Sequence, residues 1–208
     1  YFNWICGDHI LEQHIHNIDV ANWFIGSNPL SAQGMGGRET RKGRDHGHIF
    51  DHHFVEFTYP AGQIISSQCR HQRGCMNRVE EVFQGTKGHL RINSENFASM
   101  NSNNGKSIHQ YVDQGDVNPY QQEHNLLFTA IKSGTYQFDD VPNGANSTMT
   151  AILGRMATYS GQVLTWDQAM VSDLKLVPDL NSFNDPAPVV PNAEGHYPVP
   201  IPGVTKFI

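Results

Sequence analysis

The stretch GDHILEQHIHNIDVANW, from Gly7 to Trp23, is the most informative segment of the chain. It predicts one helix with an aspartate cap at Asp8 and a glycine stop at Gly26. At about 100° per residue, four of its side chains fall within about 60° of one another: Glu12, His16, Asp19 and Trp23. A carboxylate one turn before an imidazole is costly on an otherwise largely apolar helix unless the polar groups meet a partner. This helix is therefore the segment of the chain most expected to carry chemistry.

The composition and charge exclude some classes of function. The chain has 208 residues, which is enough for one sizeable domain with a core of its own. Its formal net charge of -6 argues against a nucleic-acid binder, because phosphate binding depends on clustered Lys and Arg. The only basic run, Arg38–Arg44, is predicted to be a solvated loop between two strands. No apolar run approaches the roughly 18 residues of a membrane span, so we expect neither nucleic acid nor a membrane as a partner.

Hydrophobic periodicity predicts a largely antiparallel sheet with helices beside it. We expect strands at 30–33, 49–59, 63–71, 78–84, 89–92 and 106–113. We also expect helices at 119–132 and 146–159, a short helical turn at 165–169, and an Asn- and Ser-rich loop at 94–105. These elements predict an α+β fold, an open, mostly antiparallel, twisted β-sheet with helices on one face. Residues 1–177 would form this single domain, and the Pro-rich residues 178–208 an extended tail packed on it.

From the residues alone, the polar face of the first helix has three interpretations. Its side chains could form a satisfied structural network, as buried polar groups usually do. They could hold a metal ion through His9, Glu12 and His16, whose spacings of three and four residues share one face, although the HExxH order is absent. They could also perform acid–base catalysis, because an imidazole titrates near neutrality and a neighbouring carboxylate orients it. Such a pair suits removal of a proton from an alcohol during oxidation.

Several other side chains are candidates for substrate binding. Period-two alternation in strand 49–59 puts an aspartate and a histidine on one face, and a basic residue and a histidine follow on the next strand. Each of them could equally have a structural role, such as cross-strand pairing. An arginine at the start of the basic loop could reach the cofactor or the substrate. The candidates are Asp51, His53, Arg70, His71 and Arg38.

The order of motifs along most of the chain resembles the C-terminal half of the Gfo/Idh/MocA oxidoreductases, the family of glucose-fructose oxidoreductase and inositol dehydrogenase. Gly7–Trp23 is similar to the Gly-x-x-x-x-Asp-x-x-x-His-x-x-Asp helix that opens that half. The further matching motifs are Gln33–Gly37, Ile49–His53, Cys69–His71, Gly85–Gly88, Asn118–Tyr120 and Thr165–Asp167. The ordered set is more specific than any one of these motifs.

The resemblance implies roles for three residues of the helix. It implies that His16 is the catalytic histidine, that Glu12 stands where the family has an aspartate, and that Asp19 is the later aspartate. It also implies NAD or NADP as cofactor, bound mainly by an N-terminal Rossmann domain. Neither that domain nor the Glu-Lys-Pro motif that the family has in it is present in this chain. The chain is then the substrate-binding and oligomerisation half of an NAD(P)-dependent oxidoreductase acting on a sugar, polyol or related carbohydrate. We expect a homo-oligomer formed through the sheet face, and an inactive isolated chain.

Two other functions stay open. The whole protein could be an NAD-dependent glycoside-cleaving enzyme that oxidises its substrate only transiently, or the chain could be a non-catalytic binding or assembly domain. Gly34–Gly37 does not fit a dinucleotide fingerprint, because these glycines lead into a basic loop rather than into a helix. Trp23 is expected in the core. The compartment is open between the cytoplasm and export to a bacterial periplasm, since any export signal would precede Tyr1.

Overall fold

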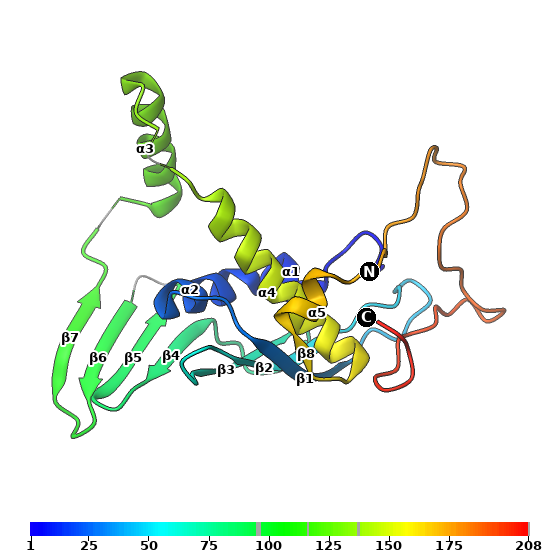
Figure 1. Cartoon of the computed structure of the whole chain (residues 1–208), viewed down its shortest axis with the longest axis horizontal. Helices are drawn as coiled ribbons and strands as arrows, with labels where there is room; N and C mark the ends of the chain where they lie inside the picture. Colours follow the sequence, from blue (N-terminus) through cyan, green and yellow to red (C-terminus); the bar gives the residue numbers. More distant parts are fainter. Residues whose placement is uncertain (95–96, 116, 137, 208) are drawn as a thin grey trace. The chain divides into compact units, whose positions relative to one another are not determined.

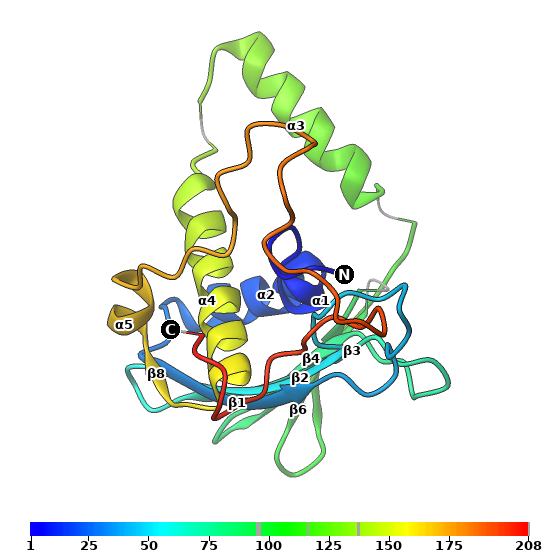
Figure 2. The same ribbon diagram turned by 90° about the vertical axis from the view of Figure 1, so that its right-hand side faces the viewer.

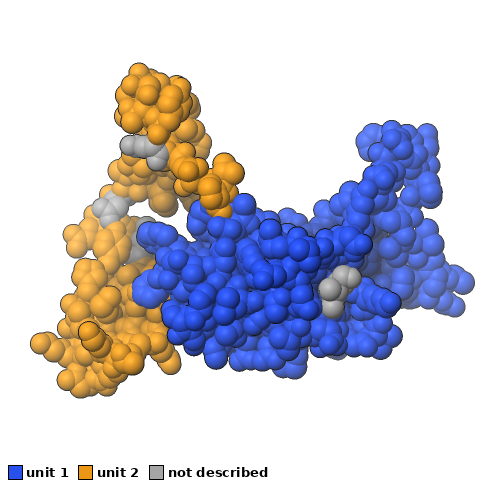
Figure 3. Space-filling view, in the orientation of Figure 1, with its two compact units in different colours: residues 1–75, 143–208 blue, residues 76–142 orange. Residues whose placement is uncertain are grey.

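The computed structural model describes residues 1–94, 97–115, 117–136 and 138–207 and has an α+β fold (Figure 1). The strands form two antiparallel, four-stranded sheets, so the predicted fold class is confirmed. The chain divides into two compact units, coloured separately in Figure 3. Unit 1 consists of residues 1–75 and 143–208, and unit 2 consists of residues 76–142.

Unit 1 is a sheet with helices on one face. Its strands pair in the order β3-β2-β1-β8 and are β1 (Ser31–Gly37), β2 (His52–Thr58), β3 (Ile64–Arg70) and β8 (Leu164–Thr165). Its helices are α1 (Asp8–Glu12), α2 (Ile15–Ile25), α4 (Val141–Ser160, which begins in unit 2) and α5 (Trp166–Met170). Figure 2 shows α1, α2 and α4 on the same face of β1 and β2. The helices therefore cover one face of the sheet, as predicted from the periodicity.

The alternation predicted around strand β2 is confirmed by its burial. His53, Val55 and Phe57 are buried and the residues between them are more exposed, so one face of the strand lies against the helices. β2 and β3, which correspond to the strands predicted at 49–59 and 63–71, pair antiparallel, with His53 opposite Cys69.

Glycines in β1 let the sheet approach α4 closely. A Cβ atom on Gly34 would lie 2.5 Å from the carbonyl oxygen of Phe54 and 2.9 Å from the Thr158 methyl group. On Gly36 it would lie 2.8 Å from the carbonyl oxygen of His52. Because real Cβ contacts are almost never this short, these glycines have a packing role inside a strand. They do not form the turn between a strand and a helix that binds the phosphates of a dinucleotide.

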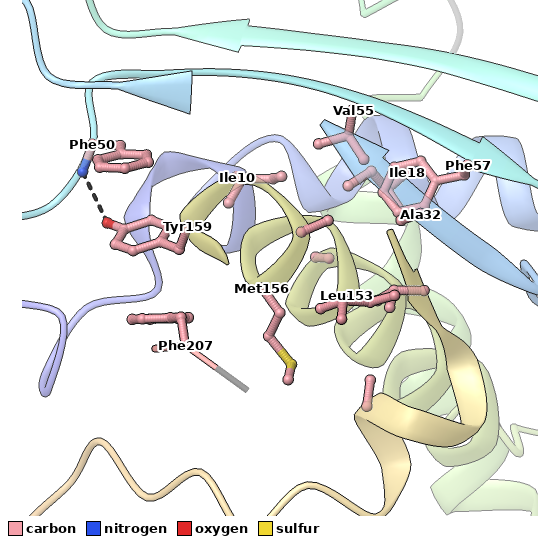
Figure 4. Packing of buried hydrophobic residues seen from close by; sticks show 14 of the residues in the cluster. Ile10, Ile18, Ala32, Phe50, Val55, Phe57, Leu153, Met156, Tyr159 and Phe207 are labelled. Carbon is pink, nitrogen blue, oxygen red and sulfur yellow. Dashed lines mark hydrogen bonds between the residues drawn. The ribbon is translucent and has the colours of Figure 1, made fainter. Parts of the chain in front are cut away.

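The core of unit 1 joins segments that are far apart in the sequence (Figure 4). The Phe50 ring stacks on Tyr159 of α4 with 3.9 Å between ring centroids. The Tyr159 hydroxyl accepts a hydrogen bond from the Phe50 amide at 2.9 Å. On its other side, Tyr159 contacts Phe207 at 4.4 Å between centroids. Phe207 is only 3% exposed, so the end of the tail packs into this core. Burying a side chain of this size contributes about 1.5–3 kcal/mol.

Unit 2 is a second sheet followed by a helix. Its strands, in the order β4-β5-β6-β7, are β4 (Glu80–Gln84), β5 (Gly88–Asn93), β6 (Phe97–Ser102) and β7 (Ser107–Val112). Helix α3 (Pro119–Ser133) begins at the predicted residue, is capped by Asn118, and stops before Gly134, which has φ 68°. The loop predicted at 94–105 is wrong over 97–102, because β6 pairs there with β5 and β7. Residues 95 and 96 lie outside the described residues.

The remaining chain is irregular. Residues 171–207 contain no helix or strand, as their prolines predict. α4 is the longest helix described, and neither it nor any other helix in the described ranges combines the length and the apolar composition of a membrane span.

Candidate active site

The polar helix predicted from the sequence consists of two short helices. α1 and α2 are separated by Gln13 and His14, whose amides both donate to the carbonyl of His9, at 3.1 and 2.9 Å. The prediction of one continuous helix is therefore wrong at this point. Its predicted end is confirmed, because Gly26 adopts the left-handed conformation with φ 77°.

The three residues predicted as catalytic have different surroundings. Glu12 accepts the amide of Gly7 through Oε1 at 2.9 Å. His16 is exposed on α2. Asp19 connects α2 to α4, because its Oδ1 accepts hydrogen bonds from the Asn143 side-chain amide at 2.9 Å and from the Ser147 hydroxyl at 2.5 Å. Within the described part of the chain no hydrogen bond joins these three side chains to one another, so Glu12 does not orient the His16 ring in this structure.

Asp8, expected as a helix cap, instead forms the centre of a buried polar network. Its backbone has φ 61°, which is rare for a residue other than glycine. Its Oδ1 is 3.1 Å from Nη2 of Arg155, while its Oδ2 accepts the Tyr159 hydroxyl at 2.5 Å and lies 3.2 Å from Nε2 of His53. The carboxylate and the His53 ring are fully buried. These contacts fix α1 against α4 and β2.

The charge of Asp8 is stabilised by that network. Burial opposes ionisation, but the His53 contact and the positive charge of Arg155 together lower the pKa of Asp8 below its usual value. The sequence patterns indicate Asp8 only as a helix cap and do not indicate Arg155 or Tyr159 as its partners. A signal was present, because Arg155 is the only charged residue in the predicted helix 146–159, and a buried guanidinium requires a counter-charge.

Asp51 orders the basic loop. Its Oδ2 accepts the amides of Glu39, Thr40 and Arg41 at 2.9, 2.7 and 3.3 Å, and the Thr40 hydroxyl at 3.0 Å. Its Oδ1 is 2.8 Å from Nδ1 of His52. Burial alone would raise the pKa of Asp51. The contact with His52 and the hydrogen bonds from the loop amides outweigh burial, so the pKa lies below its usual value. The carboxylate is therefore engaged with the protein itself.

The other predicted substrate-binding residues are partly buried and partly exposed. His53 is buried, with Nδ1 2.9 Å from the Thr158 hydroxyl, so a substrate contact there would have to displace Thr158. Arg38 donates through Nη1 to the Gly47 carbonyl, and burial lowers the pKa of its guanidinium. Arg70 is exposed at the end of β3.

His71 connects two surface elements. Its Nε2 is 2.7 Å from Oε1 of Gln13, between α1 and α2, and its Nδ1 is 2.9 Å from Nη2 of Arg41 in the basic loop. The ring stacks on His9, with 4.4 Å between centroids. Burial and the charge of Arg41 lower the pKa of His71, which keeps the ring neutral at pH 7. His71 thus joins the basic loop to the break between the two helices.

His9 is a buried, neutral histidine. Neither ring nitrogen has a hydrogen-bond partner of normal geometry among the described residues. Burial, followed by the nearby histidines, lowers the pKa of His9 to about 3. The other candidate metal ligands, Glu12 and His16, are exposed, so the structure does not bring the three together. No group of three or more potential metal ligands is found in residues 1–94, 97–115, 117–136 and 138–207.

Trp23 is 80% exposed, so its expected place in the core is wrong. Its indole lines a hollow near the end of α2 together with Ser27, Asn28 and Asn146. The apolar contacts of α2 are made by other positions, such as the buried Ile18.

Comparison with known proteins gives structural matches only. No family model and no curated protein matches the chain. A UDP-N-acetylglucosamine 3-dehydrogenase from Acidithiobacillus ferrooxidans matches 73% of this chain and 47% of its own, with a TM-score of 0.59 and 16% identity. An aldose-aldose oxidoreductase from Caulobacter crescentus matches 73% of this chain and 45% of its own, with a TM-score of 0.56 and 14% identity.

A third solved structure contains a nicotinamide cofactor. It is a levoglucosan dehydrogenase in complex with NADH and levoglucosan, and it matches 74% of this chain and 49% of its own, with a TM-score of 0.58 and 14% identity. The chain spans about half the length of each of these three proteins. The three matched proteins are oxidoreductases or dehydrogenases by name, and this chain shares its fold with about half the length of each.

Proposed function

We propose that this chain is the substrate-binding and oligomerisation half of an NAD(P)-dependent oxidoreductase that acts on a sugar, a polyol or a related carbohydrate. The observation that carries the proposal is the exposed His16 on α2, within a fold shared with sugar dehydrogenases. An imidazole at the surface of such a helix is available to a substrate hydroxyl, and its proton exchange near neutral pH suits alcohol oxidation.

In the proposed reaction His16 accepts the hydroxyl proton as the substrate carbon loses its hydride and becomes a carbonyl carbon. Asp19 acts as a positioning residue, because its hydrogen bonds to α4 fix the rotation of α2 and so the direction of His16. Glu12 is also a positioning residue, since it holds the first turn of α1 through the Gly7 amide. Substitution of either should lower turnover less than substitution of His16.

The hydride acceptor would be a nicotinamide cofactor held outside this chain. The glycine-rich segment of the chain lies inside β1 and packs against α4, so it does not supply a phosphate-binding turn. We therefore propose that NAD or NADP is bound by a separate nucleotide-binding half, and that the 208-residue chain alone is inactive.

The proposal is tested by sugar-dependent reduction of NAD⁺ and NADP⁺, measured by absorbance for the protein that combines this chain with its nucleotide-binding half. The 208-residue chain serves as the comparison. We expect turnover of at least one sugar or polyol by the combined protein and none by the chain alone. Turnover by the chain alone, or no turnover of any sugar by the combined protein, would contradict the proposal.

A further inference from the structure

The basic loop between β1 and β2 is held in a defined conformation. Its residues Arg38–Arg44 include four basic side chains and one acidic side chain, a local charge of +3 in a chain of net charge -6. Three successive amides of this loop donate to the single oxygen Oδ2 of Asp51. Because that carboxylate is buried and ionised, its hydrogen bonds fix the loop to the start of β2, which Asp51 directly precedes.

Among the described residues, the charge of Arg41 in this loop has no close counter-ion, and the same holds for Arg38 and Arg44; Arg41 differs from these two in its contact with His71. Its guanidinium contacts the neutral ring of His71 and lies 4.9 Å from the centroid of Tyr1. Within the described ranges no carboxylate lies within ion-pair distance of it. Its neighbour Lys42 is different, because its ammonium is 3.0 Å from Oε1 of Glu39.

His71 fixes the position of the Arg41 guanidinium. A guanidinium only donates hydrogen bonds, so Nδ1 of His71 accepts from Arg41, and its Nε2–H donates to Gln13. The ring is further held by its stacking on the buried His9. Arg41 therefore keeps donors on its remaining nitrogens while one edge is tied to a fixed imidazole. Such a fork binds a carboxylate or a phosphate with two parallel hydrogen bonds.

We infer that Arg41, supported by His71, is a binding subsite for an anionic group, a carboxylate or a phosphate, carried by the sugar substrate. The inference rests on the proposed function. Gln13, the other partner of His71, lies between α1 and α2, three residues before His16. The subsite is thus two hydrogen bonds away from the segment that carries the proposed proton acceptor. A uronate, an aldonate or a sugar phosphate would use it, and a neutral hexose would not.

The test compares three probes in the combined protein: D-glucose, D-glucuronate and D-glucose 6-phosphate. For each probe, kcat/KM for NAD(P)⁺ reduction and the dissociation constant by calorimetry are measured at low ionic strength. We expect at least one anionic probe to bind about tenfold or more tightly than glucose, because a hydrogen bond from a guanidinium to an anion is stronger than one between neutral groups. Tighter binding of glucuronate would show that the subsite selects a carboxylate, and tighter binding of glucose 6-phosphate that it selects a phosphate.

Three variants separate the subsite from general surface charge. Arg41→Gln should remove the preference for the anion and leave glucose binding unchanged. Arg41→Lys should retain part of the preference, because the charge remains and the planar fork is lost. Lys42→Gln, which removes an equal charge from the next position, should keep the preference.

Two results would overturn the inference. One is a wild-type protein that turns over glucose as well as both anions, which would leave the proposed function standing and remove only the subsite. The other is an anion preference that persists in Arg41→Gln. If no probe or other sugar supports turnover, the proposed function fails and this inference fails with it.

Discussion

At the scale of single residues, the structure depends on one buried carboxylate. Asp8 adopts φ 61° and is fully buried, which costs free energy that only its partners can offset. Arg155, Tyr159 and His53 all contact its two oxygens. We infer that this network fixes the start of α1, and through it the position of the segment that carries His16.

The Asp8→Asn variant should be strongly destabilised. It leaves the Arg155 guanidinium buried without a counter-charge, and breaking a buried ion pair in this way costs about 3–5 kcal/mol. Urea unfolding measures the change. Asp179→Asn is the matched control, because the exposed pair of Asp179 with Lys175 contributes about 0–1 kcal/mol. Equal midpoints for the two variants would contradict the structural role of Asp8.

Stability should fall as the pH is lowered from 7 to 4. Burial lowers the pKa of His9 to about 3 and that of His14 to about 4. Below about pH 6.5 the unfolded state therefore binds protons that the folded state does not, and each histidine contributes a slope of about 1.4 kcal/mol per pH unit. The lowered pKa of Asp8 adds a further loss below about pH 4. His9→Phe should reduce the slope between pH 6 and 4, whereas His89→Phe, an exposed control, should not.

At the scale of elements, the sequence predicts most strands and helices but not where tertiary contacts interrupt them. The alternation of β2, the start of α3 at Pro119 and the helical turn of α5 follow from local patterns, and all are confirmed. The break at Gln13 has no Gly or Pro to signal it. Its side chain bonds to His71, 58 residues away, and such a partner cannot be seen in a local pattern. β6 was missed because the pairing of its backbone outweighs its Asn- and Ser-rich composition.

The candidate site was predictable to a smaller extent. His16 is exposed and Asp19 is engaged with α4, which the spacing of the helix alone does not distinguish. Asp51 and His53 share a face as the alternation predicts, but their partners, the basic loop and Thr158, come from other elements. Periodicity thus predicts on which face of a strand or helix a side chain lies. It does not predict which residue of another element contacts that side chain, because this depends on the tertiary structure.

The contact between β1 and α4 can be tested with two glycine substitutions. Gly34→Ala should destabilise the protein by about 1–3 kcal/mol, because the new methyl group meets the Phe54 carbonyl oxygen at 2.5 Å. Gly144→Ala, in the exposed first part of α4 with open space around it, should stabilise by about 0.5–1 kcal/mol. Thermal unfolding gives both values. A neutral Gly34→Ala would contradict the close approach of strand and helix.

At the scale of the whole molecule, the edge strand β7 supports the proposed oligomer. All six of its residues are exposed, and they include Ile108 and Val112, which are 57% and 53% exposed. An apolar, unpaired edge strand favours association with another chain. Replacing both side chains with lysine should lower the mass measured by light scattering, whereas Val204→Lys, an exposed position in unit 1, should not. An unchanged mass in the β7 variant would place any subunit contact elsewhere.

The central claim is that His16 accepts the substrate proton, and one comparison of turnover tests it most directly. The rate of sugar-dependent NAD(P)⁺ reduction is measured for the combined protein, its His16→Ala variant and the control His89→Ala, which removes an exposed histidine from β5. Loss of a general base should lower kcat by about 10²–10⁴-fold in His16→Ala and leave the control unchanged. Undiminished kcat in His16→Ala would contradict the account.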